Sequence, residues 1–384
     1  MEKLQSMLIR RILPLLLIVL MLGALFVAAF AAASALPVQD LAQYWAAAHL
    51  VTKNPYSLEL TTSFERSAGV VSAAPPLVTK IPPSAIMLVL PLGFLGYKAA
   101  FALWSVMSIV VIAGCARAVW DLFTPTPSLA PALLSLLFGP TVVILMLGQL
   151  TVLVLLGITL FLILAARKRD WLAGASLLLV VAKPHVVFLF LLAVLLWILY
   201  SKRWKILVSG TVAFSAATIA AIAINPHIYA QFMDRTRLVV HETESYPNLG
   251  GALYAASGHH VLALVPQLIG LIWLAFYWRK HRVEWDWKSD GMIVLLVSVA
   301  TSYYSYPYDE VLVLPALLAA FANGKNRRMF LVGLLATNLG YALYISNVAG
   351  HFKLGYMFLW WPASAWLVTY VLSQHPRTRL APAY

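Results

Sequence analysis

Long apolar runs separated by short polar segments follow one another along the whole chain. A helix that crosses the hydrocarbon core of a bilayer needs about 20 apolar residues, and fewer where it is broken. The pattern therefore predicts an all-α protein that crosses a membrane many times. The candidate spans are residues 12–34, 82–96, 99–119, 129–147, 149–166, 171–199, 206–223, 261–278, 291–304, 309–322, 329–347 and 356–373.

Two of these runs contain helix breakers, and the breaks decide the expected topology. Run 171–199 has basic clusters at both ends, so a single span does not fit it. The Lys-Pro pair at 183–184 predicts two short helices that go out and back. The Gly-Pro pair at 139–140 predicts a broken or re-entrant segment in run 129–147, which returns to the outer face at Gln149. We then expect about twelve transmembrane helices with both ends of the chain in the cytoplasm.

Composition and charge support this class. Hydrophobic residues make up 62% of the 384 residues and charged residues only 11%, whereas soluble domains carry about 25% charged residues. The net charge is +13, but 18 of the 27 Lys and Arg residues lie in short clusters between apolar runs. This is the positive-inside pattern of a multi-pass membrane protein. It indicates membrane lipid as a partner and not nucleic acid.

The N-terminal run has some features of a signal peptide, with "ASA" at 33–35. Its apolar part, from Ile12 to Leu36, is longer than the roughly 7–15 residues of a signal core, which favours an uncleaved first span. We find no soluble domain and expect a single integral membrane domain over residues 1–384. The one cysteine, Cys115, lies within an apolar run and excludes a disulfide framework.

Three predicted outer segments hold most of the unusual polar residues. They are the first outer loop 35–81, the second outer loop 224–260 and the turn 303–310, which reads "YYSYPYDE". Irregular backbone at membrane depth occurs where it is buried in protein or lines a wet cavity. We therefore expect the functional site on the outer face.

Asp40 follows the first span and has two compatible interpretations. With Gln43 it resembles a capping box that opens a short interfacial helix through about Leu50, with Leu41 and Trp45 on its apolar face. A carboxylate fixed at a helix start is also well placed to act as a general base at the outer water boundary.

Lys183 and His185 interrupt an apolar run beside a proline. Burying an ionisable side chain in a membrane is costly, so such a residue is a functional candidate. Lys183 at an outer helix break suits an anion such as phosphate; the alternative is a lysine whose ammonium reaches the lipid headgroups.

Other charged residues have structural as well as functional interpretations. Arg237 and His241 add positive charge above the same site or belong to an amphipathic loop helix that touches headgroups. Asp309 and Glu310 bind sugar hydroxyls, pair with Lys183 or cap the next helix; capping is favoured for Glu310.

Motifs of the common soluble enzymes are missing. The chain has no P-loop, no GxSxG and no DxD, the usual signature of metal-dependent nucleotide-sugar transferases. The histidines of "HETE" and at 259–260 match no zinc spacing. We expect no metal and no cofactor.

The order of short motifs resembles a known family. The Asp after the first span, "NPY" in the loop, "PP" opening the second span and "PLGFL" within it look like polyprenol-phosphate-dependent glycosyltransferases of the GT-C fold. "GQLT", "AGASLLLVVAKP" and "YPYDEVLVLP" look more specifically like family GT87, which contains α-mannosyltransferases and arabinofuranosyltransferases. Two positions depart from the pattern: Ile81 replaces an aromatic residue, and Thr151 replaces an asparagine.

The resemblance implies an inverting transfer from a polyprenyl-phosphate sugar, mannose above arabinofuranose, to a glycolipid or cell-envelope glycan. It implies Asp40 as catalytic base and Lys183, with His185 or Arg237, beside the leaving phosphate. It places the enzyme in the bacterial inner membrane with its site facing the periplasm or exterior. The expected substrate contacts are Tyr44, Tyr56, Gln149, His241, Tyr308 and Asp309.

Two other functions use a similar arrangement of residues. A transporter or flippase of lipid-linked sugars would use the same basic groove without a general base. An oligosaccharide ligase or polymerase would transfer a preassembled glycan, but the chain lacks a very large outer loop with an Arg/His array.

Overall fold

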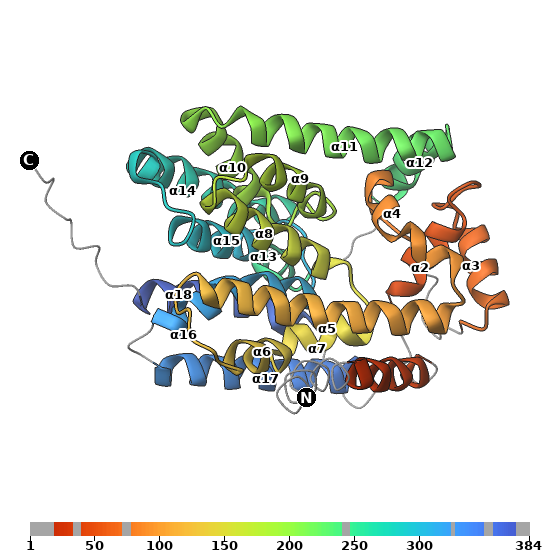
Figure 1. Cartoon of the computed structure of the whole chain (residues 1–384), viewed down its shortest axis with the longest axis horizontal. Coiled ribbons are helices and arrows are strands. Elements are labelled where there is room, and N and C mark those ends of the chain that lie inside the picture. Colours follow the sequence, from red (N-terminus) through yellow and green to blue (C-terminus); the bar gives the residue numbers. More distant parts are fainter. Residues whose placement is uncertain are drawn as a thin grey trace, which may run out of the picture. The chain divides into compact units, whose positions relative to one another are not determined.

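The computed structural model describes residues 19–33, 40–70, 78–239, 246–323, 327–348 and 356–373. Within these ranges the protein is helical and contains no β-strand, which confirms the predicted all-α class (Figure 1). The chain forms two compact units, of which the first comprises residues 1–111, 145–149 and 221–236 and the second the remainder. The single-domain organisation stays a prediction.

The first unit holds the helices of the first outer loop and their supports. Its elements are the helix Val19–Ala32, α2 (Leu41–His49), α3 (Leu58–Ser67), α4 (Pro83–Val89), η1 (Leu90–Phe94), the first part of α5 (Tyr97–Asp121) and most of α12 (Ile228–Val239). α2 packs against α3, α4 and η1. The described part of loop 35–81 therefore folds mainly into the two helices α2 and α3.

The second unit holds most of the helices. They are α6 (Ala130–Leu136), most of α7 (Gly139–Leu147), α8 (Thr151–Ala166), α9 (Asp170–Val180), α10 (Phe188–Ser201), α11 (Trp204–Ile224, whose last turn belongs to the first unit), α13 (Leu249–Ser257), η2 (His260–Leu264), α14 (Val265–His281), η3 (Arg282–Glu284), α15 (Asp290–Ala300), η4 (Pro307–Val313), α16 (Leu314–Asn323), α17 (Arg327–Val348), η5 (Tyr356–Trp360) and α18 (Pro362–Ser373). α15 is apolar and buried on nearly all sides, as expected of a core helix, and packs against α10, α14, α16, α18 and η4.

Several described helices have the length and composition of membrane spans. The four that qualify on their own are Tyr97–Asp121, Trp204–Ile224, His260–Glu284 and Arg328–Ser346, and the bent pair α6–α7 makes a fifth if it counts as one span. Six further apolar helices of 10–17 residues are shorter than a full span. The protein is thus an all-α membrane protein, while the twelve spans and the GT-C fold stay predictions.

Both predicted helix breaks are confirmed. Run 129–147 divides into α6 and α7, which are bent by 61° at the Gly-Pro pair. Run 171–199 divides into α9 and α10, with Lys183 in the turn between them. Proline lacks the N–H that continues a helix and clashes with the preceding turn, so these breaks are local consequences of sequence.

The Asn338 side chain of α17 forms hydrogen bonds with the backbone groups at the break between α6 and α7. Asn338 donates from Nδ2 to the Leu137 carbonyl (3.0 Å) and accepts at Oδ1 from the Gly139 N–H (2.9 Å). A broken helix in an apolar setting needs such partners for the backbone groups it exposes. Gly139 is also required sterically, because a Cβ there would lie 2.5 Å from the Tyr341 Cβ.

We expect Asn338→Ala to lower the thermal midpoint of the detergent-solubilised protein. The substitution removes the partner of two backbone groups, and each unsatisfied group costs about 1–3 kcal/mol. Leu339→Ala is the matched control, since the neighbouring Leu339 side chain is 64% exposed and we expect only a small change. Equal midpoints for the two variants would show that Asn338 does not support the break.

Candidate active site

Asp40 directly precedes α2, and the helix itself was predicted correctly. It runs from Leu41 to His49 and is capped at Leu50. Two details of the prediction are wrong. The Asp40 backbone is itself helical (φ −65°, ψ −20°) and its carboxylate caps nothing, while the Gln43 amide lies 3.5 Å from the carboxylate. α2 is not interfacial either, because seven of its nine residues are buried.

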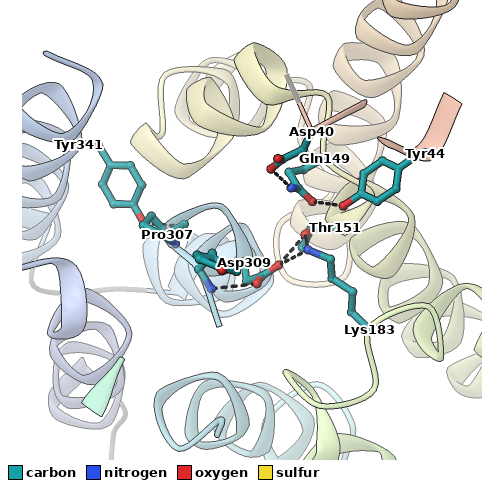
Figure 2. Close-up of polar contacts among 9 residues, drawn as sticks. Asp40, Tyr44, Gln149, Thr151, Lys183, Pro307, Asp309 and Tyr341 are labelled. Atoms are coloured by element: carbon teal, nitrogen blue, oxygen red, sulfur yellow. Dashed lines mark hydrogen bonds and ion pairs between the residues drawn. The ribbon is translucent and has the colours of Figure 1, made fainter. Parts of the chain in front are cut away.

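The Asp40 carboxylate belongs to a hydrogen-bond chain within the first unit. Gln149 Nε2 donates to Asp40, and the Tyr44 hydroxyl donates to Gln149 Oε1 at 3.0 Å (Figure 2). Gln149 is 1% exposed, and Tyr44 is buried on α2. The two residues predicted to touch substrate therefore hold the carboxylate of Asp40 in one orientation. An anionic acceptor makes such hydrogen bonds stronger than neutral ones.

The backbone before Gln149 explains why this amide reaches Asp40. Gly148 has φ +69°, a conformation that is costly for residues with a Cβ. A Cβ at this position would also lie 2.7 Å from the Leu41 Cβ. Glycine therefore lets the chain turn sharply against the start of α2. The "GQ" of the motif is thus a turn followed by the residue that the turn positions.

Tyr56 has a structural role in the same unit. Its hydroxyl donates to the Ile81 carbonyl at 2.9 Å, and its N–H donates to Asn54 Oδ1, a local turn typical of "NPY". Burial raises the pKa of the Tyr56 hydroxyl well above its usual value. The ring packs against Phe232 of α12. Its predicted contact with sugar stays untested.

A second polar cluster lies in the second unit, around Lys183. Lys183 Nζ donates to Asp309 Oδ1 (2.9 Å) and to Thr151 Oγ1 (3.0 Å), and the Thr151 hydroxyl donates to the same carboxylate oxygen (2.6 Å; Figure 2). The ammonium also lies 4.5 Å from the centroid of the Tyr308 ring. Lys183 is only 7% exposed. The alternative interpretation, in which its ammonium reaches the lipid headgroups, is therefore wrong. The pairing of Asp309 with Lys183 is confirmed.

The position of Asp309 is fixed by the segment that carries it. Its Oδ2 accepts from the Tyr306 N–H at 3.0 Å, which caps η4. Tyr341 of α17 donates to the Pro307 carbonyl (2.6 Å) and lies 3.2 Å from Glu310 Oε2. The capping role expected of Glu310 therefore belongs to Asp309, because Glu310 is directed to Tyr341 instead.

His185 lies at the edge of an aromatic cluster in the second unit. His185 packs against Tyr304 (4.7 Å between centroids), which packs against Tyr246 and Tyr306. Nε2 of His185 is buried and has no hydrogen-bond partner among the described residues. Polar atoms of this kind are rare in native proteins and require an explanation.

The remaining predicted residues are less informative. Arg237 lies in the last turn of α12 with an exposed side chain. His241 lies outside the described residues. Within the part of the chain that the structure describes, no three His, Cys, Asp or Glu side chains form a group that would hold a metal ion.

Sequence reasoning missed Tyr246 and Tyr304, and also Glu65 of α3. The two tyrosines gave no separate signal, because tyrosine is common at membrane boundaries. Thr151 was noted only as a departure from the family pattern, but its hydroxyl bridges Lys183 and Asp309.

Comparison with known proteins gives one match. A model described as glycosyltransferase family 87 matches residues 81–302, more than half of the chain. The matched segment includes Gln149, Lys183 and His185 but ends before Asp309 and begins after Asp40. No curated protein and no solved structure matches the chain. With "GQLT" and "VVAKP" inside the matched segment, the chain belongs to glycosyltransferase family 87.

Proposed function

We propose that the protein transfers a sugar, mannose or arabinofuranose, from a polyprenyl phosphate to a hydroxyl group of a glycolipid or cell-envelope glycan, with inversion at the anomeric carbon. The observation that carries the proposal is the hydrogen-bond chain from Tyr44 through Gln149 to Asp40, in a chain of a glycosyltransferase family. A carboxylate held in one orientation is what a general base requires.

Asp40 acts on the attacking group. As the acceptor oxygen forms its bond to the anomeric carbon, its proton passes to the Asp40 carboxylate. Gln149 is a positioning residue, because its amide fixes the carboxylate. The electrons of the breaking carbon–oxygen bond go to the leaving phosphate, and one displacement converts a β-linked donor into an α-linked product.

Lys183 stabilises the leaving phosphate, together with His185 and Arg237. The ammonium is already bound to Asp309, so phosphate has to share it with a carboxylate. Asp309 and Thr151 then serve to hold Lys183 in place. Nε2 of His185 has no hydrogen-bond partner among the described residues, which supports a role as a second donor to the phosphate oxygens. Unlike the Lys183 ammonium, this donor would be neutral. Preorganised donors of this kind stabilise charge that develops in the transition state.

One residue of the Asp40 cluster lies next but one in the sequence to a residue of the Lys183 cluster. Gln149, which positions Asp40, and Thr151, which bonds to Lys183, are separated only by Leu150. This supports one reaction in which the base and the phosphate-binding group take part together. The polyprenyl tail lies in lipid, and we place the reaction on the periplasmic or outer face of the bacterial inner membrane.

Gln149→Leu should lower kcat about 10- to 100-fold and change the acceptor KM little. Leucine has a similar volume but donates no hydrogen bond, so Asp40 loses its orientation, and a bond to a charged group is worth about 1.5–3 kcal/mol. Steady-state kinetics of the purified variant measure the effect. Gln267→Leu, on the second-unit helix α14, is the matched control; an equal loss in both variants would remove Gln149 from this role.

The donor is tested by incubating the purified enzyme with a panel of β-linked polyprenyl-phosphate sugars carrying mannose or arabinofuranose, and with nucleotide sugars. Octyl glycosides serve as acceptors. We expect free polyprenyl phosphate and an α-linked product, read by mass spectrometry and NMR. Transfer from a nucleotide sugar alone would overturn the donor assignment.

The same assay separates the alternatives. A flippase would move the lipid-linked sugar across proteoliposomes without releasing polyprenyl phosphate. A ligase or polymerase would require a preassembled glycan on the donor and would not use a single sugar.

A further inference from the structure

Helix α3 buries polar side chains and exposes leucines, the reverse of the usual arrangement. Its sequence is "LELTTSFERS", and its buried residues are Thr61 and Glu65, whereas Leu58 and Leu60 are 49% and 36% exposed. A helix that only supports a fold buries its leucines and exposes its acids. Departures from this rule are expected at functional sites.

The buried side of α3 has unsatisfied polar atoms. Glu65 is 5% exposed, and its Oε1 has no hydrogen-bond partner among the described residues. Thr61 Oγ1, one turn earlier on the same side, is also buried without a partner there. Burying such groups without a partner is costly. Thr61 Oγ1 and Glu65 Oε1 therefore have hydrogen-bonding capacity that the hydroxyl groups of a ligand would satisfy.

Aromatic packing fixes α3 beside the helix that follows Asp40. Phe64 stacks on His49 (4.1 Å between centroids) and on Trp45 (4.7 Å), both on α2. Trp45 also packs against Tyr97 at 5.3 Å. Glu65 directly follows Phe64 on α3, and Asp40 directly precedes α2. The two carboxyl groups are thus carried by a packed pair of helices in the first unit.

We infer that Glu65, with Thr61, binds a ring hydroxyl of the acceptor next to Asp40 and so determines acceptor specificity. The ligand class is a polyhydroxylated ring, such as a hexose or a cyclitol. The inference rests on the proposed function, because it needs a sugar acceptor whose neighbouring hydroxyl is activated by Asp40. Carboxylates accept hydrogen bonds from hydroxyl groups without supplying competing donors.

The titration of Glu65 gives an independent readout. Burial raises the pKa of this carboxyl to about 7. The titratable groups of α2, which packs against α3, are Asp40 at its N-cap, Tyr44 and His49. The start of α5, next to Trp45, adds Tyr97 and Lys98, and α3 itself carries Glu59 and Arg66. The ionised carboxylate accepts hydrogen bonds more strongly than the neutral carboxylic acid. The KM for the acceptor sugar should therefore fall as the pH rises through about 7.

The test compares Glu65→Gln with Glu59→Gln, an exposed acid on the same helix. Octyl α-D-mannopyranoside, octyl β-D-glucopyranoside and myo-inositol are supplied as acceptor probes, with the polyprenyl-phosphate sugar that the wild-type enzyme turns over. We expect Glu65→Gln to raise the probe KM about 10- to 100-fold with little change in kcat. It should also remove the pH dependence of KM, while Glu59→Gln behaves as wild type.

Two further variants keep the inference testable if Glu65→Gln folds poorly. Glu65→Asp, which keeps the charge, should recover part of the affinity, and Thr61→Ser should retain it. An unchanged probe KM in Glu65→Gln, or donor turnover that uses none of the three probes, would overturn the inference and leave the glycosyltransferase proposal intact. Absence of any donor turnover by the wild type would instead count against the proposed function.

Discussion

Replacing Asp40 with asparagine is expected to lower kcat for sugar transfer about 10²- to 10⁴-fold, the usual contribution of a general base. Asparagine has nearly the same shape and can still contact Gln149, but it cannot take the proton of the acceptor hydroxyl. Release of polyprenyl phosphate from the donor, followed by mass spectrometry, measures the loss. Donor binding should persist, because Asp40 does not contact the phosphate in the proposed reaction.

Asp121→Asn is the matched control for this experiment. Asp121 lies at the end of α5 in an exposed ion pair with Arg117 (2.6 Å), and we expect wild-type turnover from its variant. Full sugar transfer by Asp40→Asn, with the fold retained, would remove Asp40 from the mechanism and favour the flippase alternative.

Lys183→Met is expected to reduce both stability and turnover, for two different reasons. It leaves the Asp309 carboxylate, which is 1% exposed, without its cation, and breaking a buried ion pair costs about 3–5 kcal/mol. It also removes the charge that stabilises the leaving phosphate, for which losses of about 10²- to 10³-fold in kcat are typical. Thermal midpoints and donor turnover are measured on the same preparations.

The double variant Lys183→Met/Asp309→Asn separates the two effects. Methionine and asparagine are both uncharged, so the double variant buries no unpaired charge. Its thermal midpoint should therefore return most of the way to the wild-type value. Turnover should stay low, because the phosphate still lacks its cation. Recovery of turnover together with stability would show that the pair only supports the fold.

The helix breaks were predicted from the sequence because their causes are local. The Gly-Pro pair at 139–140 and the Lys-Pro pair at 183–184 interrupt a helix whatever surrounds them. Lys183 was expected to have a specific partner or ligand, and Asp309 was one of the partners considered.

The contacts that define each cluster were harder to predict because they join distant parts of the chain. Gln149 lies 105 residues from Tyr44 and 109 from Asp40. Nothing in the local sequence shows that both side chains meet one amide. The capping expectation for Asp40 failed for the same reason, because a distant donor competes with the N–H groups of the nearby helix.

Glu65 shows a different limit of sequence reasoning. "LELTTSFERS" looks like an exposed loop helix, in which acids and threonines face water. Only the packing of Phe64 on α2 shows that the polar side faces inward. The sequence of a helix alone does not say which of its sides packs against a distant part of the chain.

The distance in sequence between Lys183 and Asp309 has a consequence for how the protein is made. The two residues are 126 positions apart, so at about 5–20 residues per second the ribosome adds Asp309 about 6–25 seconds after Lys183. Burying an ionisable side chain in a membrane is costly until it has a partner, and Asp309 is the partner of Lys183. The newly made α9–α10 segment must therefore hold its ammonium for seconds without the carboxylate that later neutralises it. A nascent chain stalled before Asp309 should be extracted from the bilayer more easily than one stalled after it.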